Sequence, residues 1–502
     1  PEVRCNCYDG AYGQLCERPI EPFCLNHCSS RGMCQHGHCA CHAGFYGADC
    51  SLVARAREEE VERPRPLIYI YELPTEYNTG MLEQRIKKVK CVVRYYDDKN
   101  WTRWENNLYG AELVVYEQLM RSKHRTTNAE RADLFFVPFF ASCFISRFLG
   151  PTARHRLDKQ HMTIPKVVEE YKRLIQFLKT NYPYWDRHQG KDHVWMMFHD
   201  EGGCFAPKEM WPSIMITHWG RRTPAVSPNS THTFQPHCFN PNRVFSEKER
   251  METIGDHACY DPNKDVVVPS WRAPQTIAHS PHILANLKPD QARAKDVSDF
   301  PLDHPSNKSI LFFFKGDIRM DVPEHSMGIR QQVEALFRGR EKEGLVVGKH
   351  SPDYNKELAQ SKFCGVFPGN GWSGRMEDSI LHGCIPVIVQ DDIDVPLETL
   401  LNIGEFAIRY PRAKLDQLAE YLQSIPENEV VRMQRNIQLV WPRYYYVSYI
   451  QMEVDWRKQR NLPPIPLLDA IVQQAGKRED AIDSLLIELW NRKRNRVTSL
   501  YG

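Results

Sequence analysis

The fold is decided by the stretch 363–389, which reads FCGVFPGNGWSGRMEDSILHGCIPVIV. It consists of an apolar run, a glycine-rich turn, a segment with helical spacing and a second apolar run. Short apolar runs joined through a helix are typical of neighbouring parallel strands with a helical crossover. The stretch therefore predicts strands at 363–367 and 385–389 and a helix at 374–382.

The turn and the start of this helix carry groups that suit a phosphorylated ligand. Ser373 can cap the helix, whose N-terminus has free N–H donors and a partial positive charge, and Arg375 adds a planar fork of donors matched to phosphate. Asp378 lies one turn further on, where a carboxylate can accept hydrogen bonds from ribose hydroxyls. An ordinary tight turn with a surface arginine is the alternative interpretation. Glycine lets the backbone approach a ligand closely, and the turn holds Gly369, Gly371 and Gly374.

The same alternation of strands and helices extends over two halves of the chain, separated by a loop-rich segment. In the first half, strands are predicted at 67–71, 133–139, 193–198 and 265–269, with helices at 108–122 and 166–179. In the second half, further strands are predicted at 309–314, 344–348 and 405–408, with helices at 328–337, 354–360 and 415–423. Two parallel α/β halves predict a cleft between them, with ligands at the carboxyl ends of the strands.

Cysteine is concentrated at the start of the chain. Nine of the 16 cysteines lie in the first 50 residues, too short a segment to bury a core without covalent links. Six of them, from Cys24 to Cys50, follow C-x3-C-x5-C-x4-C-x-C-x8-C, and a zinc knuckle formed with nearby histidines is one interpretation of this cluster. The spacing more closely resembles an EGF-like module, although it leaves 15 disulfide connectivities open by itself. The resemblance implies the pairs Cys24–Cys34, Cys28–Cys39 and Cys41–Cys50.

The final part of the same pattern also occurs earlier in the chain. It resembles the second half of another EGF-like module and implies a Cys7–Cys16 bridge, which leaves Cys5 without a partner. We therefore expect the chain to be cut or processed at Pro1, with more protein upstream. Disulfides indicate an oxidising compartment. Three glycosylation sequons agree with it, at Asn100, Asn229 and Asn307. The expected location is the secretory pathway, with the Golgi lumen preferred and the cell surface or extracellular space as the alternative.

The composition excludes several classes of protein. The chain has 502 residues, a net charge of +2, 42% hydrophobic and 25% charged residues, as in ordinary globular proteins. So small a net charge argues against a whole-protein nucleic-acid binder. The longest mostly apolar run, 134–145, has about 12 residues and is too short to cross a bilayer. We expect no nucleic-acid partner, and membrane attachment only through a segment absent from this chain.

Five motifs in order resemble one family of enzymes. The stretch 363–389 resembles the C-terminal signature of the exostosin (GT47) glycosyltransferases, F-C-…-P-…-S-x-R-x-x-E/D-…-G-C-x-P. It is preceded by ADLFFVPF at 132–139, KDHVW at 191–195, KDVVVP at 264–269, and LFFFKG at 311–316 followed by GIR at 328–330. The resemblance covers about 66–447 and implies a GT-B fold, with two Rossmann-like domains facing a cleft. It also implies an inverting glycosyltransferase that uses a nucleotide sugar. EGF-like modules before such a domain resemble the green-lineage members.

These observations divide the chain into five predicted parts. They are an EGF-like region at 1–50, a charged linker at 51–66, an N-terminal acceptor domain at 67–290, a C-terminal nucleotide-sugar domain at 291–450, and C-terminal helices at 451–502 that pack on the body.

The resemblance implies roles for residues of the donor site. Lys315, Arg330 and Arg375 would neutralise the diphosphate, Asp378 would hold the ribose, and Tyr354 would pack on the uracil of a UDP-sugar. Ser373 and Arg319 complete the predicted site. Asp317 and Arg319 stand where animal members have a basic and an aromatic residue. Since three cations already serve the diphosphate, we expect no metal or other required cofactor.

Three further features complete the predictions. The motif 391–394, Asp-Asp-Ile-Asp, favours a structural or acceptor-facing role over a metal site. The acceptor hydroxyl needs a base, and His199, Asp200 and Glu201 follow a predicted strand, where side chains reach a cleft; mutual contacts among these residues are the alternative.

Cys364 and Cys384 begin neighbouring strands and are predicted to pair; the family implies a second pair, Cys91–Cys143. The remaining cysteines, Cys204, Cys238 and Cys259, have no predicted partner.

The sequence thus predicts an enzyme that moves a sugar from a UDP-sugar to a glycan or glycoprotein acceptor, with the EGF-like region as a possible contact for a protein partner. A secreted, non-catalytic protein that binds carbohydrate through a degenerate transferase domain is the alternative.

Overall fold

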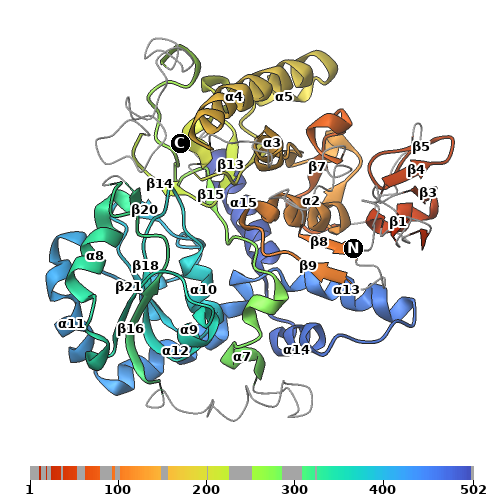
Figure 1. Ribbon diagram of the computed structural model, residues 1–502. Coiled ribbons are helices and arrows are strands. Elements are labelled where there is room, and N and C mark those ends of the chain that lie inside the picture. Colours follow the sequence, from red (N-terminus) through yellow and green to blue (C-terminus); the bar gives the residue numbers. More distant parts are fainter. Residues whose placement is uncertain are drawn as a thin grey trace, which may run out of the picture. The chain divides into compact units, whose positions relative to one another are not determined.

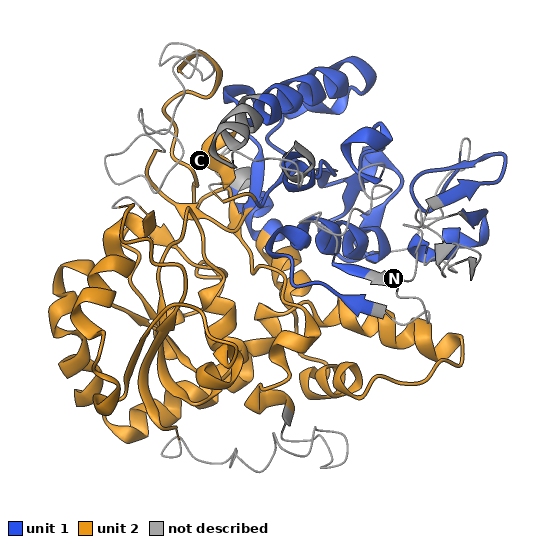
Figure 2. Ribbon diagram, in the orientation of Figure 1, with its two compact units in different colours: residues 1–198, 207–216, 489–502 blue, residues 199–206, 217–488 orange. Residues whose placement is uncertain are grey.

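The fold was analysed in a computed structural model that describes residues 11–12, 18–19, 24–35, 38–53, 63–79, 93–96, 102–148, 156–200, 202–224, 251–284, 308–322 and 325–498. The chain forms two compact units (Figures 1 and 2). Unit 1 contains Pro1–Phe198, Pro207–Ile216 and Leu489–Gly502, and unit 2 contains His199–Ala206 and Thr217–Glu488. Residues 217–290 therefore group with unit 2, whereas the sequence placed them in an N-terminal domain; the predicted domain boundaries stay a prediction.

Unit 1 begins with small antiparallel pairs of strands stabilised by disulfides. β3 (Gly32–Gln35) pairs with β4 (His38–Cys41), and β5 (Phe45–Tyr46) pairs with β6 (Leu52–Val53). The structure forms the three predicted disulfides, Cys24–Cys34, Cys28–Cys39 and Cys41–Cys50, with Cα atoms 5.3 to 5.5 Å apart. The alternative of a zinc knuckle is wrong for these six cysteines, because every one of their sulfurs is bonded to another sulfur.

The main sheet of unit 1 is parallel. Its strands lie in the order β10 (Arg125–Thr126), β7 (Ile68–Ile70), β11 (Leu134–Val137), β12 (His193–Met197) and β13 (Ile214–Thr217). Strands β11 and β13 are buried and almost wholly apolar, as expected for strands covered on both faces, whereas the two residues of β10, Arg125 and Thr126, are polar and buried. Among the described residues before Phe198, this unit contains the helices α2 (Ala111–Arg121), α3 (Ala141–Phe148), α4 (Arg156–Asn181) and α5 (Tyr184–His188). Helix α4 begins ten residues before its predicted start at residue 166.

Unit 2 contains a second parallel sheet, drawn in green to cyan in Figure 1. Its order is β17 (Leu345–Gly348), β16 (Ile310–Lys315), β18 (Ser361–Val366), β19 (Ile385–Ile388) and β21 (Ile408–Arg409). Helices α8 (Ile329–Phe337) and α11 (Leu418–Ser424) lie on one face, and α9 (Tyr354–Ala359) and α10 (Arg375–Leu381) lie on the other. This sheet brings the ends of β16 and β18 side by side.

The remaining elements of unit 2 are shorter or C-terminal. β14 (Gly220–Arg221) pairs with β20 (Ile393–Asp394), and β15 (Val266–Val267) covers part of the predicted strand 265–269. Helices α12 (Glu427–Val440), α13 (Val447–Gln459) and α14 (Pro466–Ala475) follow. Helix α15 (Ala481–Thr498) lies within the predicted helical segment 451–502, and its residues from Leu489 onward are assigned to unit 1. Among the described residues, no helix has the length and apolar character needed to cross a membrane.

In the part of unit 2 that the structure describes, two disulfides link distant residues. Cys364–Cys384 joins β18 to the start of β19, as predicted, with Cα atoms 5.9 Å apart, and it packs in a buried cluster with Phe313 and Leu358. Cys204 pairs with Cys259, although no partner was predicted for either. In unit 1, Cys143 is disulfide-bonded, but Cys91 lies outside the described residues, so their pairing stays a prediction. Other predicted features also lie outside the described residues: Cys5, Cys7, Cys16, Cys238, Asn100, Asn229, Asn307 and Glu201.

The α/β class, the two parallel sheets expected for a GT-B enzyme and the disulfide-rich N-terminal segment are therefore confirmed. The last strand of the second sheet was predicted too early, at 405–408, since residues 403–405 form a 3-10 helix and the strand is Ile408–Arg409.

Candidate nucleotide-sugar site

The predicted donor residues gather at the carboxyl edge of the unit 2 sheet. Lys315 is the last residue of β16, the strand beside β18, and the glycine-rich turn follows β18 directly. Arg375 begins α10 at the end of this turn, and Arg330 lies in the first turn of α8. The parallel topology thus collects side chains from segments that are far apart in the sequence.

Arg330 is buried, and its hydrogen-bond partners among the described residues are neutral oxygens. Its side chain, 5% exposed, donates to the backbone oxygen of Asp317 at 2.8 Å and that of Phe367 at 3.3 Å, and lies 3.5 Å from the hydroxyl of Ser373. No carboxylate among the described residues forms an ion pair with it. Burial, with a further contribution from the positive charge of Arg375, lowers the pKa of Arg330 to about 9. A buried cation of this kind is stabilised when an anion binds beside it.

Arg375 lies close to Arg330. Its guanidinium donates to the backbone oxygen of Lys315 at 2.6 Å and to the hydroxyl of Tyr354 at 2.7 Å. The guanidinium carbons of Arg330 and Arg375 each lie 5.4 Å from the ring centre of Phe314, a distance that allows cation–π attraction. Phe314 and the backbone therefore hold two like charges together.

Gly316 provides the space for this arrangement. A Cβ atom at residue 316 would lie 2.3 Å from a terminal nitrogen of Arg375. Lys315, immediately before it, forms an ion pair with Glu357 of α9, and Glu357 also accepts from Ser351 at 2.6 Å. The lysine is partly exposed, so its ammonium group contacts both a carboxylate and solvent.

Asp378 accepts hydrogen bonds from two sides. Nε of Arg272 donates to Oδ1 at 2.6 Å, and the Tyr354 hydroxyl donates to Oδ2 at 3.1 Å; Arg375 lies 3.5 Å away. Burial opposes ionisation of Asp378, but the charges of Arg272 and Arg375 outweigh it and hold its pKa below the usual value. The carboxylate is therefore ionised and fixed in orientation.

The structure corrects the predicted role of Ser373 and shows where Arg319 lies. Ser373 was predicted to cap the helix, but α10 starts at Arg375 with Gly374 as its N-cap and no side-chain capping bond. The prediction is wrong because the helix begins one residue too late for Ser373 to be its cap, and the hydroxyl faces Arg330 instead. Arg319 lies on the loop after β16, where it is 38% exposed and pairs with Asp317 at 2.6 Å.

The predicted catalytic-base segment reaches the same turn through its backbone. The amide of Trp372 donates to the backbone oxygen of Asp200 at 3.0 Å. His199 and Asp200 are both half-buried, and the imidazole of His199 lies 6.3 Å from the ring of Phe205. Glu201 lies outside the described residues. Asp394 of the acidic motif pairs with Arg222 at 3.0 Å, which is a structural contact.

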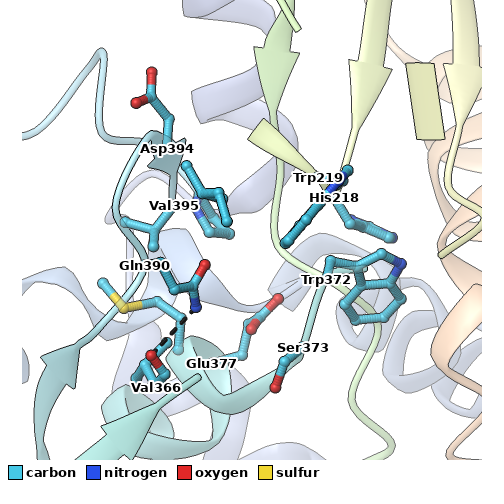
Figure 3. Close-up of a pocket in the computed structure, with 12 residues that line it drawn as sticks. His218, Trp219, Val366, Trp372, Ser373, Glu377, Gln390, Asp394 and Val395 are labelled. Carbon is cyan, nitrogen blue, oxygen red and sulfur yellow. Dashed lines mark hydrogen bonds between the residues drawn. The ribbon is translucent and has the colours of Figure 1, made fainter. Parts of the chain in front are cut away.

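A small cavity lies behind the turn (Figure 3). The volume open to the centre of a water molecule is about 10 Å³, enough for about one water. Glu377 projects into it from α10; its Oε1 accepts from the amide and hydroxyl of Ser270, whereas Oε2 has no partner among the described residues. Burial raises the pKa of Glu377. Burial also lowers the pKa of His218, whose ring lies 4.6 Å from that of Trp372, to about 3, so this histidine is neutral.

Three residues of the site were not predicted from the sequence. Arg272 lies three positions after the KDVVVP motif. The sequence marks it only as an arginine that follows a predicted strand, which is too common a feature to predict a site residue. Glu357 lies three residues after Tyr354, on the same helix. His350 follows β17 and packs its ring 6.0 Å from Tyr354, at the same edge of the sheet.

Parallel α/β proteins bind their ligands at the carboxyl ends of the strands. Cations at this edge in unit 2 indicate the class of α/β enzymes that bind phosphorylated ligands there. Residues 62–425 match the family model described as the Exostosin GT47 domain. This chain therefore belongs to the exostosin GT47 family and is a glycosyltransferase.

Several plant proteins are similar to most of the chain. A protein of Oryza sativa subsp. japonica described as "Probable glucuronosyltransferase" is 26% identical over 379 residues, which cover 73% of each chain. Two Arabidopsis thaliana proteins are also similar. One, described as a "Probable glucuronoxylan glucuronosyltransferase", is 24% identical over 74% of this chain and 66% of its own. The other, described as a "Probable beta-1,4-xylosyltransferase", is 25% identical over 73% of this chain and 74% of its own. As members of one family, such enzymes use a nucleotide-sugar donor and a glycan acceptor.

Proposed function

We propose that this chain is an inverting glycosyltransferase that moves a sugar from a UDP-sugar to a glycan or glycoprotein acceptor. The observation that carries the proposal is Arg330, a buried guanidinium whose hydrogen-bond partners among the described residues are neutral oxygens. The charge of Asp317 opposes the effects of burial and of Arg375 but does not outweigh them, so the pKa of Arg330 stays lowered. Leaving a buried charge without a counter-charge is costly. A diphosphate at the carboxyl edge of the sheet would supply that charge.

The other contacts suit the remaining parts of a nucleotide. Asp378 is ionised and still has lone pairs free beside those used by Arg272 and Tyr354, so it can accept from ribose hydroxyls. The ring of Tyr354 is partly exposed and lies near the exposed His350, which gives a surface on which uracil could stack. Lys315 completes the cationic side of the site.

The reaction would then be a single displacement. The acceptor hydroxyl attacks the anomeric carbon from the face opposite the nucleotide, a new C–O bond forms, and the bond to the diphosphate oxygen breaks. UDP leaves with the electron pair, and Lys315, Arg330 and Arg375 stabilise its charge. One of His199, Asp200 and Glu201 takes the proton of the acceptor hydroxyl. The mechanism assigns no step to a metal ion.

The first prediction tests the cationic site. Arg375→Ala and Lys315→Ala should each reduce transfer by two orders of magnitude or more, since removing one such donor costs about 3 kcal/mol of transition-state stabilisation. Turnover with UDP-glucuronic acid and UDP-xylose, the donors suggested by the relatives' names, is the measurement, together with calorimetric titration of UDP.

A matched control keeps this test specific. Arg340 forms an exposed ion pair with Glu343 at 2.6 Å in the same unit, and Arg340→Gln should leave turnover and UDP affinity unchanged. Wild-type turnover in both Arg375→Ala and Lys315→Ala would overturn the mechanism. A wild-type chain that does not bind UDP would favour the non-catalytic, carbohydrate-binding alternative.

We also propose that the protein acts in the secretory pathway, with the Golgi lumen preferred over the cell surface. The disulfides in both units support an oxidising compartment. The small disulfide-rich segment is proposed to contact a protein partner. Co-localisation of the full-length protein with a Golgi marker tests the location, and a cytosolic distribution would overturn it.

A further inference from the structure

Arg272 connects two parts of the candidate site, Asp378 and the turn at Gly374. It is 3% exposed and lies in the segment after β15, far in sequence from the turn that it contacts. Its Nε donates to Asp378 at 2.6 Å and its Nη2 to the backbone oxygen of Gly374 at 2.5 Å. One guanidinium therefore fixes both the predicted ribose carboxylate and the turn that precedes Arg375.

The segment that carries Arg272 is itself held rigidly. The hydroxyl of Tyr446 donates to the backbone oxygen of Pro269 at 2.7 Å, and the fully buried ring of Trp271 packs 5.6 Å from that of Tyr449. The neighbouring Ser270 donates to Glu377 of α10, and Nη1 of Arg272 in turn donates to the Ser270 hydroxyl at 3.1 Å. The start of α10 is thus bonded to this segment at two successive residues, Glu377 and Asp378.

Gly374 leaves room for the guanidinium. A Cβ atom at residue 374 would lie 1.6 Å from Nη2 of Arg272, and the guanidinium is buried, so little space is open for it to move aside. The glycine is therefore explained by Arg272, in addition to any approach of a ligand to the backbone.

We infer that Arg272 is a positioning residue of the transfer reaction, which orients Asp378 toward the ribose and holds the turn at Gly374. This inference rests on the proposed function. Arg272 is almost fully buried and bonds to Asp378. It would therefore act on the substrate only through Asp378, so it is not a catalytic residue. Its removal should weaken nucleotide binding even where the fold is kept.

The charge of Arg272 gives a readout that a merely structural role would not change. Without it, the buried Asp378 would lose the charge that stabilises its ionised form most, and its pKa would rise. Protonation at mildly acidic pH would then remove the acceptor for the ribose. The weakening should therefore grow as the pH falls. Burial keeps the pKa values of the nearby His350 and His382 below the ordinary 6.5. Both histidines therefore stay neutral over most of the range between pH 5.5 and 8. The charged and titratable groups that face Asp378 are Arg272, Arg375, Tyr354, His350 and His382.

The test compares UDP dissociation constants of the full chain between pH 5.5 and 8. The terminal phosphate of UDP titrates near pH 6, so the ratio of the variant to the wild-type constant is compared at each pH. Arg272→Gln should raise the constant about tenfold or more at pH 8, and the ratio should increase further toward pH 5.5. Arg272→Lys keeps the charge but cannot reach both Asp378 and Gly374, so its ratio should be raised and nearly independent of pH.

Thermal unfolding of each variant shows whether it is folded, and Arg340→Gln is the matched surface control. Should Arg272→Gln fail to fold, Arg272→Lys and Gly374→Ala, which displaces the guanidinium, carry the test. Ratios close to one for the folded variants overturn the inference while leaving the proposed function intact. Absence of UDP binding by the wild-type chain overturns the proposed function instead.

Discussion

At the scale of single residues, sequence motifs predicted some residues of the nucleotide-sugar site and missed others. The FKG and S-x-R motifs led to Lys315 and Arg375, and the structure brings them together, with Arg375 bonded to the backbone oxygen of Lys315. Arg272 could not be predicted in this way, because its partner Asp378 is 106 positions away and no local pattern marks the contact. The cap assigned to Ser373 failed because a sequence pattern defines a helix end only to within a residue or two.

Tyr354 gives a prediction at the residue scale. Its hydroxyl accepts from Arg375 and donates to Asp378, so it joins the diphosphate side of the site to the ribose side. Tyr354→Phe keeps the ring but leaves two charged groups with one fewer partner each. We expect a loss of UDP affinity of about tenfold with little change in thermal stability, measured by calorimetric titration and thermal unfolding. An unchanged affinity would show that the hydroxyl does not order the site.

At the scale of elements, apolar runs bounded by turns were the reliable signal. The predicted strand 363–367 is seen as Ser361–Val366, and 385–389 as Ile385–Ile388. Strand β10 has two residues and could not be distinguished from a loop by its sequence. Its place in the sheet is set by pairing with β7, a contact between distant segments. The strand β10 is therefore determined by its pairing with a distant segment, and the local sequence pattern holds no information on that pairing.

The crossover from β18 to β19 gives a prediction at the same scale. Cys364 and Cys384 close a loop of 20 positions that contains the turn and α10. The double variant Cys364→Ala/Cys384→Ala should lower the free energy of unfolding by about 3 kcal/mol, mainly because the unfolded chain gains freedom. UDP affinity should change little, since neither cysteine contacts the cations of the site. Denaturant unfolding of the oxidised wild type and the variant measures the difference. An equal stability would mean that packing with Phe313 and Leu358 alone fixes the crossover.

At the scale of the molecule, the class of fold was predictable because it depends on the order of apolar runs and on the cysteine spacing. How the disulfide-rich segment is held within unit 1 was not predictable, because its contacts there include a buried ion pair between residues far apart in the sequence. Asp49, at 0% exposure, accepts from Arg125 at 2.7 Å and from Asn26 at 2.6 Å. Asn26 and Asp49 lie inside the EGF-like cysteine pattern, but Arg125 is 76 positions from Asp49 and lies in none of the motifs found in the sequence, so no local pattern marks the contact.

This ion pair predicts a dependence of stability on pH. Burial alone would raise the pKa of Asp49, but Arg125 and three hydrogen bonds outweigh it and hold the pKa below the ordinary 3.8. A carboxyl with a lowered folded pKa contributes stability that is complete above 3.8 and is lost as the pH falls through the folded value. Asp49→Asn leaves Arg125 buried without its counter-charge and should cost about 3 to 5 kcal/mol at pH 7. The difference in thermal midpoint between wild type and Asp49→Asn should be large at pH 7 and should shrink below pH 3.8. A difference that stays constant as the pH falls to about 3 would show that Asp49 acts through packing and not through its charge.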